Sequence, residues 1–237
     1  MMIRIFKNPT ELSFEFCNEL MKISSQKGKC FIALSGGSTP RIIFQTLSEH
    51  FKDRIQWNKI HLFWSDERCV SPDDSKSNYG MAKQYLLDFI NIPEENVHRI
   101  KGENEPGMEA IRYTEEIKNI VNSKNGLPSF DLVMLGIGED GHTASIFPDQ
   151  MHLLNSQNIC EVAVHPLTGQ KRITLTGSTI NDSDEVIFLV TGRSKADILK
   201  KILEDQNKIY PAAFIKPING KLKYFIDEEA SGLLNKK

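Results

Sequence analysis

The 237-residue sequence lacks the features of a membrane, secreted or nucleic-acid-binding protein. No stretch approaches the roughly 18 apolar residues of a membrane-spanning helix, and the first residues, MMIRIFKNP, contain no apolar signal core. The net charge is −2, so the chain has no general basic field for nucleic acid. We therefore expect a cytoplasmic protein, a monomer or a weak dimer, that binds a small molecule and neither nucleic acid nor membrane.

The sequence also contains few residues at spacings that would indicate a metal site, a disulfide or a catalytic serine. The four cysteines, Cys17, Cys30, Cys69 and Cys160, are scattered without C-x-x-C spacing, which indicates reduced thiols and not disulfides or a zinc site. His142 has no second histidine or glutamate at metal-ligand spacing, and no G-x-S-x-G elbow is present for a serine hydrolase. We expect no metal and no cofactor.

The order of apolar runs and amphipathic segments predicts an α/β fold. Strands are expected at residues 3–6, 30–34, 60–64, 97–100, 132–135, 160–164, 172–176 and 185–191, with one or two more within 211–226. Helices are expected at residues 10–27 with Thr10 as N-cap, 40–47, 79–89, 108–122 and 195–204. Residues 123–129 and 149–158 should be irregular, and 228–237 a frayed tail. Because strands and helices alternate, we predict one domain over residues 1–237, a doubly wound, mainly parallel sheet with helices on both faces.

The stretch from Phe130 to Pro148, FDLVMLGIGEDGHTASIFP, joins a buried strand to a glycine-rich turn and then to His142. Its GIGEDG segment satisfies the dinucleotide pattern G-x-G-x-x-G, but it begins more than halfway along the chain. Pro148 also leaves barely two turns for the helix that this pattern requires. A histidine at the carboxyl end of a strand is a candidate general base near neutral pH, although a structural role stays open.

A second glycine-rich loop follows the expected strand 30–34 and precedes a helix. Its residues are Ser35, Gly36, Gly37, Ser38 and Thr39. Such a loop can present backbone N–H groups and a helix dipole to an anion. A tight turn with an ordinary cap is the alternative, but it does not require three hydroxyl groups. The loop is not a Walker A loop, because no Gly-Lys-Ser/Thr follows.

Charged residues follow two other strands or begin a helix. Asp66, Glu67 and Arg68 come directly after strand 60–64, where they need either solvent or partners. Arg68 and Arg172 suit phosphate or carboxylate, and Asp66 would orient Arg68 or a substrate hydroxyl. Lys195 at a helix start opposes the helix dipole, which points to phosphate contact or to a tolerated surface lysine.

Together these motifs resemble the 6-phosphogluconolactonases. LSGGSTP at 34–40, SDERCVSPDDSKSNYGMA at 65–82, GIGEDGHTASIFP at 136–148 and RITLT at 172–176 stand in that family's order and cover nearly the whole chain. The resemblance implies the α/β fold shared with glucosamine-6-phosphate and ribose-5-phosphate isomerases. It also implies cofactor-free hydrolysis of 6-phospho-D-glucono-1,5-lactone to 6-phospho-D-gluconate, in the oxidative pentose phosphate pathway.

The resemblance assigns roles to single residues. It implies that His142 is the base and that Asp66, Arg68, Arg172 and the glycine loop line the substrate site. The chain departs from the family mildly, with Ile146 where leucine is common and Tyr224 where tryptophan is usual.

The main alternative is the sister family of glucosamine-6-phosphate deaminases. Their pattern is similar to D-G-H-I-A-F-N-E-P where this chain has residues 140–148, and to D-E-Y where it has residues 66–68. This chain has Phe147 in place of the carboxylate and Arg68 in place of the tyrosine. Ring opening and enolisation need several acid–base groups, whereas lactone hydrolysis needs one base and oxyanion stabilisation. The sequence therefore favours the lactonase, with a sugar-phosphate-binding regulator on the same fold as a non-enzymatic alternative.

Overall fold

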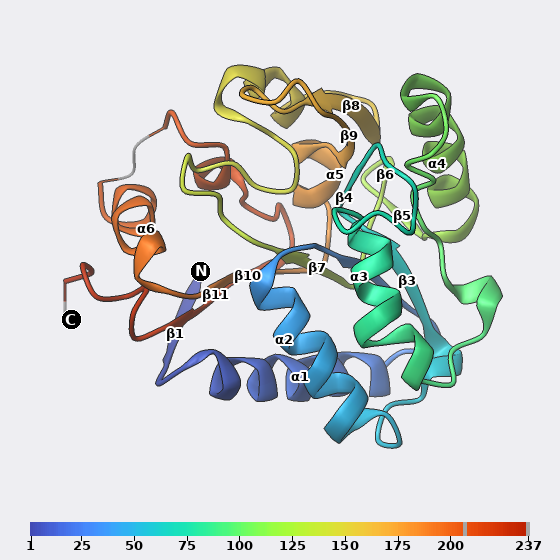
Figure 1. The fold of residues 1–237 in the computed structure, drawn as a ribbon, viewed down its shortest axis with the longest axis horizontal. Coiled ribbons are helices and arrows are strands. Elements are labelled where there is room, and N and C mark those ends of the chain that lie inside the picture. The colour runs from blue at the N-terminus through green and yellow to red at the C-terminus, as the bar shows by residue number, and fades with distance from the viewer. Residues whose placement is uncertain (206–207, 236–237) are drawn as a thin grey trace.

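The computed structural model describes residues 1–205 and 208–235. Its centre is a six-stranded sheet of order β1-β11-β10-β7-β2-β3, in which every neighbouring pair is parallel (Figure 1). The strands are β1 (Met2–Phe6), β2 (Cys30–Leu34), β3 (Ile60–Trp64), β7 (Leu132–Leu135), β10 (Glu185–Val190) and β11 (Lys221–Asp227). The four strands β2, β3, β7 and β10 are buried along their whole length, because both faces of the sheet are covered.

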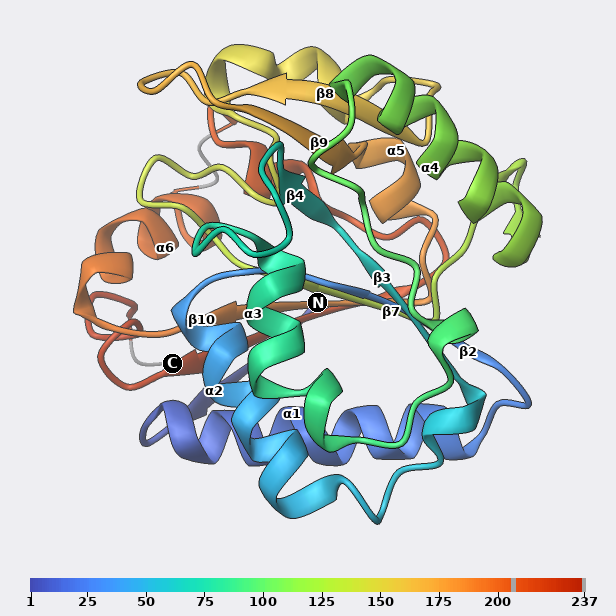
Figure 2. The same ribbon diagram turned by 45° about the vertical axis from the view of Figure 1, so that its right-hand side comes forward.

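Helices lie on both faces of this sheet, which confirms the predicted doubly wound α/β class. Their bounds are α1 (Pro9–Ser25), α2 (Ser38–Thr46), α3 (Asn78–Tyr85), α4 (Pro106–Ile120), α5 (Gly177–Asn181) and α6 (Ala196–Leu203). In Figure 2, α1 and α2 lie below the sheet, and α4 and α5 lie above it. No helix within residues 1–205 and 208–235 is long and apolar enough to cross a membrane.

A second, antiparallel sheet lies above the main one and was not predicted. It consists of β4 (Asp66–Arg68), β9 (Lys171–Leu175) and β8 (Cys160–Val164), in the order β4-β9-β8. The charged segment after β3 is thus a strand, because its backbone pairs with β9, and the Asp66 and Glu67 side chains are buried. This pairing brings Arg68 directly opposite Arg172.

Several predicted boundaries were wrong. The Asn8 side chain, and not Thr10, caps α1 by accepting a hydrogen bond from the Glu11 amide at 2.9 Å. Residues 97–100 form only one bridge, from Val97 to Leu62, because the chain leaves the sheet edge at once. Residues 211–214 form a 3₁₀ turn and not a strand.

Other corrections concern segments predicted to be irregular. Residues 148–154 are helical, and residues 123–129 contain a hairpin of β5 (Ser123–Lys124) and β6 (Leu127–Pro128). The expected tail is anchored, since Ala230 is buried and its amide donates to Asp227 at 2.8 Å. Residues 236–237 of that tail lie outside the described residues.

Candidate active site

A cavity of about 240 Å³ lies where β2, β7 and β10 end, which is the edge at which open α/β sheets bind ligands. All ten residues singled out in the sequence lie on its wall: Ser35, Gly36, Gly37, Ser38, Thr39, Asp66, Arg68, His142, Arg172 and Lys195. They come from segments far apart in the sequence, and the sheet brings them together. Their individual roles stay predictions.

The glycine loop connects β2 to α2 and presents the start of that helix to the cavity. Gly37 has φ +118°, a backbone conformation that residues with a side chain rarely adopt. Within the described residues, no side chain caps the first amides of α2. A Cβ on Gly36 would lie 1.7 Å from Asn78 Oδ1, so only glycine fits there. Thr39 Oγ1 lies 2.7 Å from Thr191 Oγ1, which ties the loop to the end of β10.

His142 forms a pair with Asp140, a residue that the sequence reading passed over. Asp140 Oδ1 lies 2.5 Å from His142 Nδ1 and also accepts the His142 amide at 3.1 Å. This arrangement places the proton on Nδ1 and leaves Nε2 as the acceptor nitrogen of the ring. The sequence signal for this pair is a carboxylate two residues before the histidine in the glycine turn GEDGH.

The environment of this pair favours a charged Asp140. Burial raises the pKa of the Asp140 carboxyl, but the hydrogen bond and charge of His142 outweigh it, so the pKa lies below its ordinary value. The His142 ring packs against Phe147 with centroids 4.9 Å apart. Gly138 makes room for the pair, because a Cβ there would lie 2.1 Å from His142 Nδ1.

The two arginines of the cavity lie side by side on β4 and β9. Asp66 Oδ2 is 3.9 Å from an Arg172 nitrogen and accepts a hydrogen bond from Ser145 at 2.6 Å. Arg68 instead donates to the Lys76 carbonyl at 2.5 Å, so among residues 1–205 and 208–235 the cation beside Asp66 is Arg172, and a contact of Asp66 with a substrate hydroxyl stays a prediction. Ser145, like Asp140, was not among the predicted site residues.

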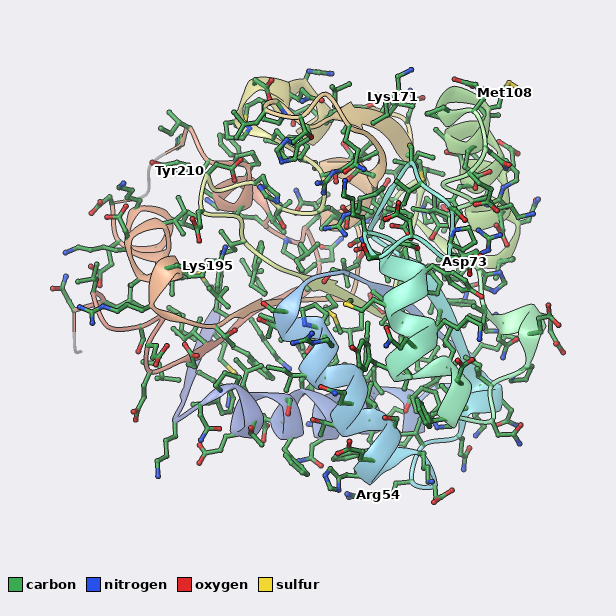
Figure 3. All side chains as sticks on the ribbon, viewed as in Figure 1. Arg54, Asp73, Met108, Lys171, Lys195 and Tyr210 are labelled. Atoms are coloured by element: carbon green, nitrogen blue, oxygen red, sulfur yellow. The ribbon has the colours of Figure 1, made fainter. Side chains whose placement is uncertain are left out.

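The wall of the cavity carries three cationic side chains, Arg68, Arg172 and Lys195, and one carboxylate, Asp66. Burial lowers the pKa of Arg172; the Asp66 carboxylate opposes this effect, and the neighbouring Arg68 adds to it. Lys195 lies at the N-terminal end of α6 (Figure 3) and has no ion pair within the described part of the chain. An anionic group bound here would relieve the repulsion between these cations. In the described ranges 1–205 and 208–235, no cluster of three His, Cys, Asp or Glu side chains could hold a metal.

A cavity at a strand edge, with an uncapped helix N-terminus, three cationic side chains and an aspartate-bound histidine, is typical of an α/β enzyme acting on a small anionic substrate. Comparison with known proteins refines this class. Residues 9–224 match the family described as glucosamine-6-phosphate isomerases/6-phosphogluconolactonase.

A 6-phosphogluconolactonase of Haemophilus influenzae is 46% identical over 206 residues, covering 86% of this chain and 87% of its own. The solved 6-phosphogluconolactonase of Trypanosoma brucei has a TM-score of 0.89 at 30% identity, covering 99% of this chain and 98% of its own. A monomeric glucosamine-6-phosphate deaminase has a TM-score of 0.84 at 21% identity, covering 98% and 100%, which is a likeness of fold alone. The chain therefore belongs to the glucosamine-6-phosphate isomerase/6-phosphogluconolactonase family.

Proposed function

We propose that the protein hydrolyses 6-phospho-D-glucono-1,5-lactone to 6-phospho-D-gluconate, with His142 as the general base. The observation that carries the proposal is His142, paired with Asp140, on the wall of a cavity that also holds a glycine-rich loop and the cationic side chains of Arg68, Arg172 and Lys195. Similarity to named lactonases over most of the chain supports the same reaction. The reaction would belong to the oxidative pentose phosphate pathway of the cytoplasm.

The chemistry needs one proton acceptor, which then becomes a proton donor. His142 Nε2 accepts a proton from a water molecule as the water oxygen attacks the lactone carbonyl carbon, C1. The Asp140 carboxylate stabilises the imidazolium that forms. When the tetrahedral intermediate collapses, the bond from C1 to the ring oxygen breaks, and the imidazolium returns the proton to that oxygen. The product is an open-chain acid.

Substrate orientation comes from the phosphate, which lies at the other end of the molecule. Arg68, Lys195 and the first amides of α2 are our assignments for phosphate contact, since all of them line the cavity. Holding the phosphate would fix the ring with C1 beside His142, so that remote binding energy contributes to orientation. Arg172, whose guanidinium lies 5.7 Å from the centre of the Phe147 ring that packs on His142, would then face the lactone end.

Deamination of glucosamine 6-phosphate is the rival reaction for this family. Phe147 is fully buried where deaminases carry a carboxylate, and its ring packs on His142 and His165. Asp66 is engaged by Ser145, so the pair of His142 and Asp140 is the acid–base centre that stays available. One such centre suits lactone hydrolysis better than an isomerisation with several proton transfers.

The test is to incubate the protein with freshly prepared 6-phosphogluconolactone and follow acid release in a pH-stat. Ammonia release from glucosamine 6-phosphate is measured in parallel. We expect acid release well above the spontaneous rate and no ammonia. Ammonia release without accelerated lactone hydrolysis would refute the proposal.

A further inference from the structure

Glu67 has an unusual environment for a charged side chain next to a substrate cavity. It is only 2% exposed, between Asp66 and Arg68 on β4. Its carboxylate accepts four hydrogen bonds, two on each oxygen. Oε1 accepts from the amides of Arg68 and Asn78 at 2.8 Å each, and Oε2 accepts from the Tyr79 amide at 2.8 Å and from Ser77 Oγ at 3.0 Å.

The donors show what this carboxylate holds. The amides of Asn78 and Tyr79 are the first two of α3, so the Glu67 carboxylate on β4 accepts hydrogen bonds from the N-terminus of that helix. Burial raises the pKa of Glu67, and the three backbone amides oppose that change. A glutamine would offer a single acceptor oxygen in place of two, so half of these donors would lose their partner.

The segment that Glu67 holds reaches the substrate cavity at two points. Asn78 Nδ2 donates to the Asp66 carbonyl at 2.9 Å, and Asn78 Oδ1 occupies the space that a Cβ on Gly36 would take. The residue before Ser77 is Lys76, and its carbonyl accepts a hydrogen bond from the Arg68 guanidinium. The Arg68 side chain and the glycine loop are thus both placed against a segment that Glu67 fixes.

We propose that Glu67 is a positioning residue that sets the Arg68 guanidinium and the glycine loop for the substrate phosphate. It touches no substrate itself and acts through Lys76 and Asn78. The inference rests on the proposed function, because it names the residue that organises the phosphate-binding side of that same cavity.

The chain offers a matched control in Glu109. This glutamate is 1% exposed and also satisfies several donors: the Lys101 amide at 2.7 Å, Asn104 Nδ2 at 2.8 Å and Arg112 Nε at 2.8 Å. It lies on α4 and does not line the cavity. Glu109 also forms an ion pair with Arg112, so Glu109→Gln removes a charge interaction in addition to buried hydrogen bonds. Only Glu67→Gln removes such interactions beside the site.

The experiment measures three quantities for the wild type and both variants. They are the Tm, the Kd of inorganic phosphate by NMR titration, and KM and kcat on phosphorylated and unphosphorylated gluconolactone. Both variants should lower the Tm. Glu67→Gln alone should raise the phosphate Kd and the KM of the phosphorylated lactone about tenfold, while kcat on the unphosphorylated lactone changes less than about threefold.

The same Kd and KM for Glu67→Gln and Glu109→Gln would overturn the proposal, since the carboxylate would then serve stability alone. Wild-type protein that binds no phosphate would overturn it as well. If Glu67→Gln does not fold, Glu67→Asp and Glu109→Asp decide by the same comparison, because aspartate keeps both oxygens and the charge but is one methylene shorter. If the wild type lacks lactonase activity but Glu67→Gln still weakens phosphate binding relative to wild type, the proposed function is refuted and this inference stands.

Discussion

Replacing Asp140 with asparagine tests the assignment of the histidine pair most directly. The change keeps the size of the side chain but removes the charge that holds His142 Nδ1. Without it, the ring loses its preferred tautomer, and the imidazolium of the transition state loses its partner. We expect a lower kcat and a nearly unchanged KM, because Asp140 does not contact the phosphate side of the cavity.

The structure sets the size of the effect. Asp140 Oδ1 accepts two hydrogen bonds from His142, one from Nδ1 at 2.5 Å and one from the amide at 3.1 Å. Hydrogen bonds to charged groups contribute about 1.5–3 kcal/mol, which corresponds to about 10- to 100-fold in rate. The Asp140 side chain is 45% exposed, and water screens its charge, so the lower half of that range is expected.

The assay is steady-state lactone hydrolysis in a pH-stat, corrected for the spontaneous reaction. Asp149→Asn is the control, because Asp149 is an exposed aspartate of the helical segment 148–154 and accepts a hydrogen bond from Gln150 at 3.2 Å. A folded Asp140→Asn variant with kcat within about twofold of wild type would refute the reasoning.

The lowered pKa of Asp140 gives the same pair a signature in stability. A carboxyl whose pKa is lower in the folded than in the unfolded state stabilises the fold above its ordinary pKa. That contribution is lost as the pH falls through the lowered pKa. Urea unfolding of wild type and Asp140→Asn should therefore differ most near neutral pH and converge in acid, and a constant difference would contradict the assignment.

Four further predictions follow from the site and the buried histidines. His142→Asn should lower kcat about 10²- to 10⁴-fold in a folded protein, measured by the same assay, and near-normal kcat would remove His142 from the mechanism. Arg68→Ala should reduce kcat/KM far more on the phosphorylated than on the unphosphorylated lactone, and equal losses would assign Arg68 to chemistry or fold. Exhaustive chelation should leave activity unchanged, and loss restored by a divalent ion would reveal a metal site. Burial, with the charges of His98 and Lys29, lowers the pKa of His61 to about 4. The unfolding free energy should therefore fall as the pH drops from about 6.5 towards about 4, and His61→Gln should remove part of that fall. A His61→Gln variant with the same fall as wild type would contradict this assignment.

Local sequence determined the parallel sheet and its main connections. Runs such as Cys30–Leu34 and Leu132–Leu135 are apolar throughout, because a strand covered on both faces has no polar side. Gly37 after β2 and Gly141 after β7 have positive φ, which other residues rarely adopt, and these glycines marked the loops that line or adjoin the cavity. The sequence could therefore name candidate residues at the ends of β2, β3 and β7, whereas Asp140 and Ser145 were missed.

Only the tertiary structure decided how those residues are partnered. β4 has no strand signal of its own, since three charged residues become a strand through pairing with β9. Asp66 contacts Arg172 and Ser145, which are distant in the sequence, and Glu67 holds a helix start ten or more residues further on. Such contacts depend on how the parallel and the antiparallel sheet pack against each other. The order of residue types along the chain does not contain that packing.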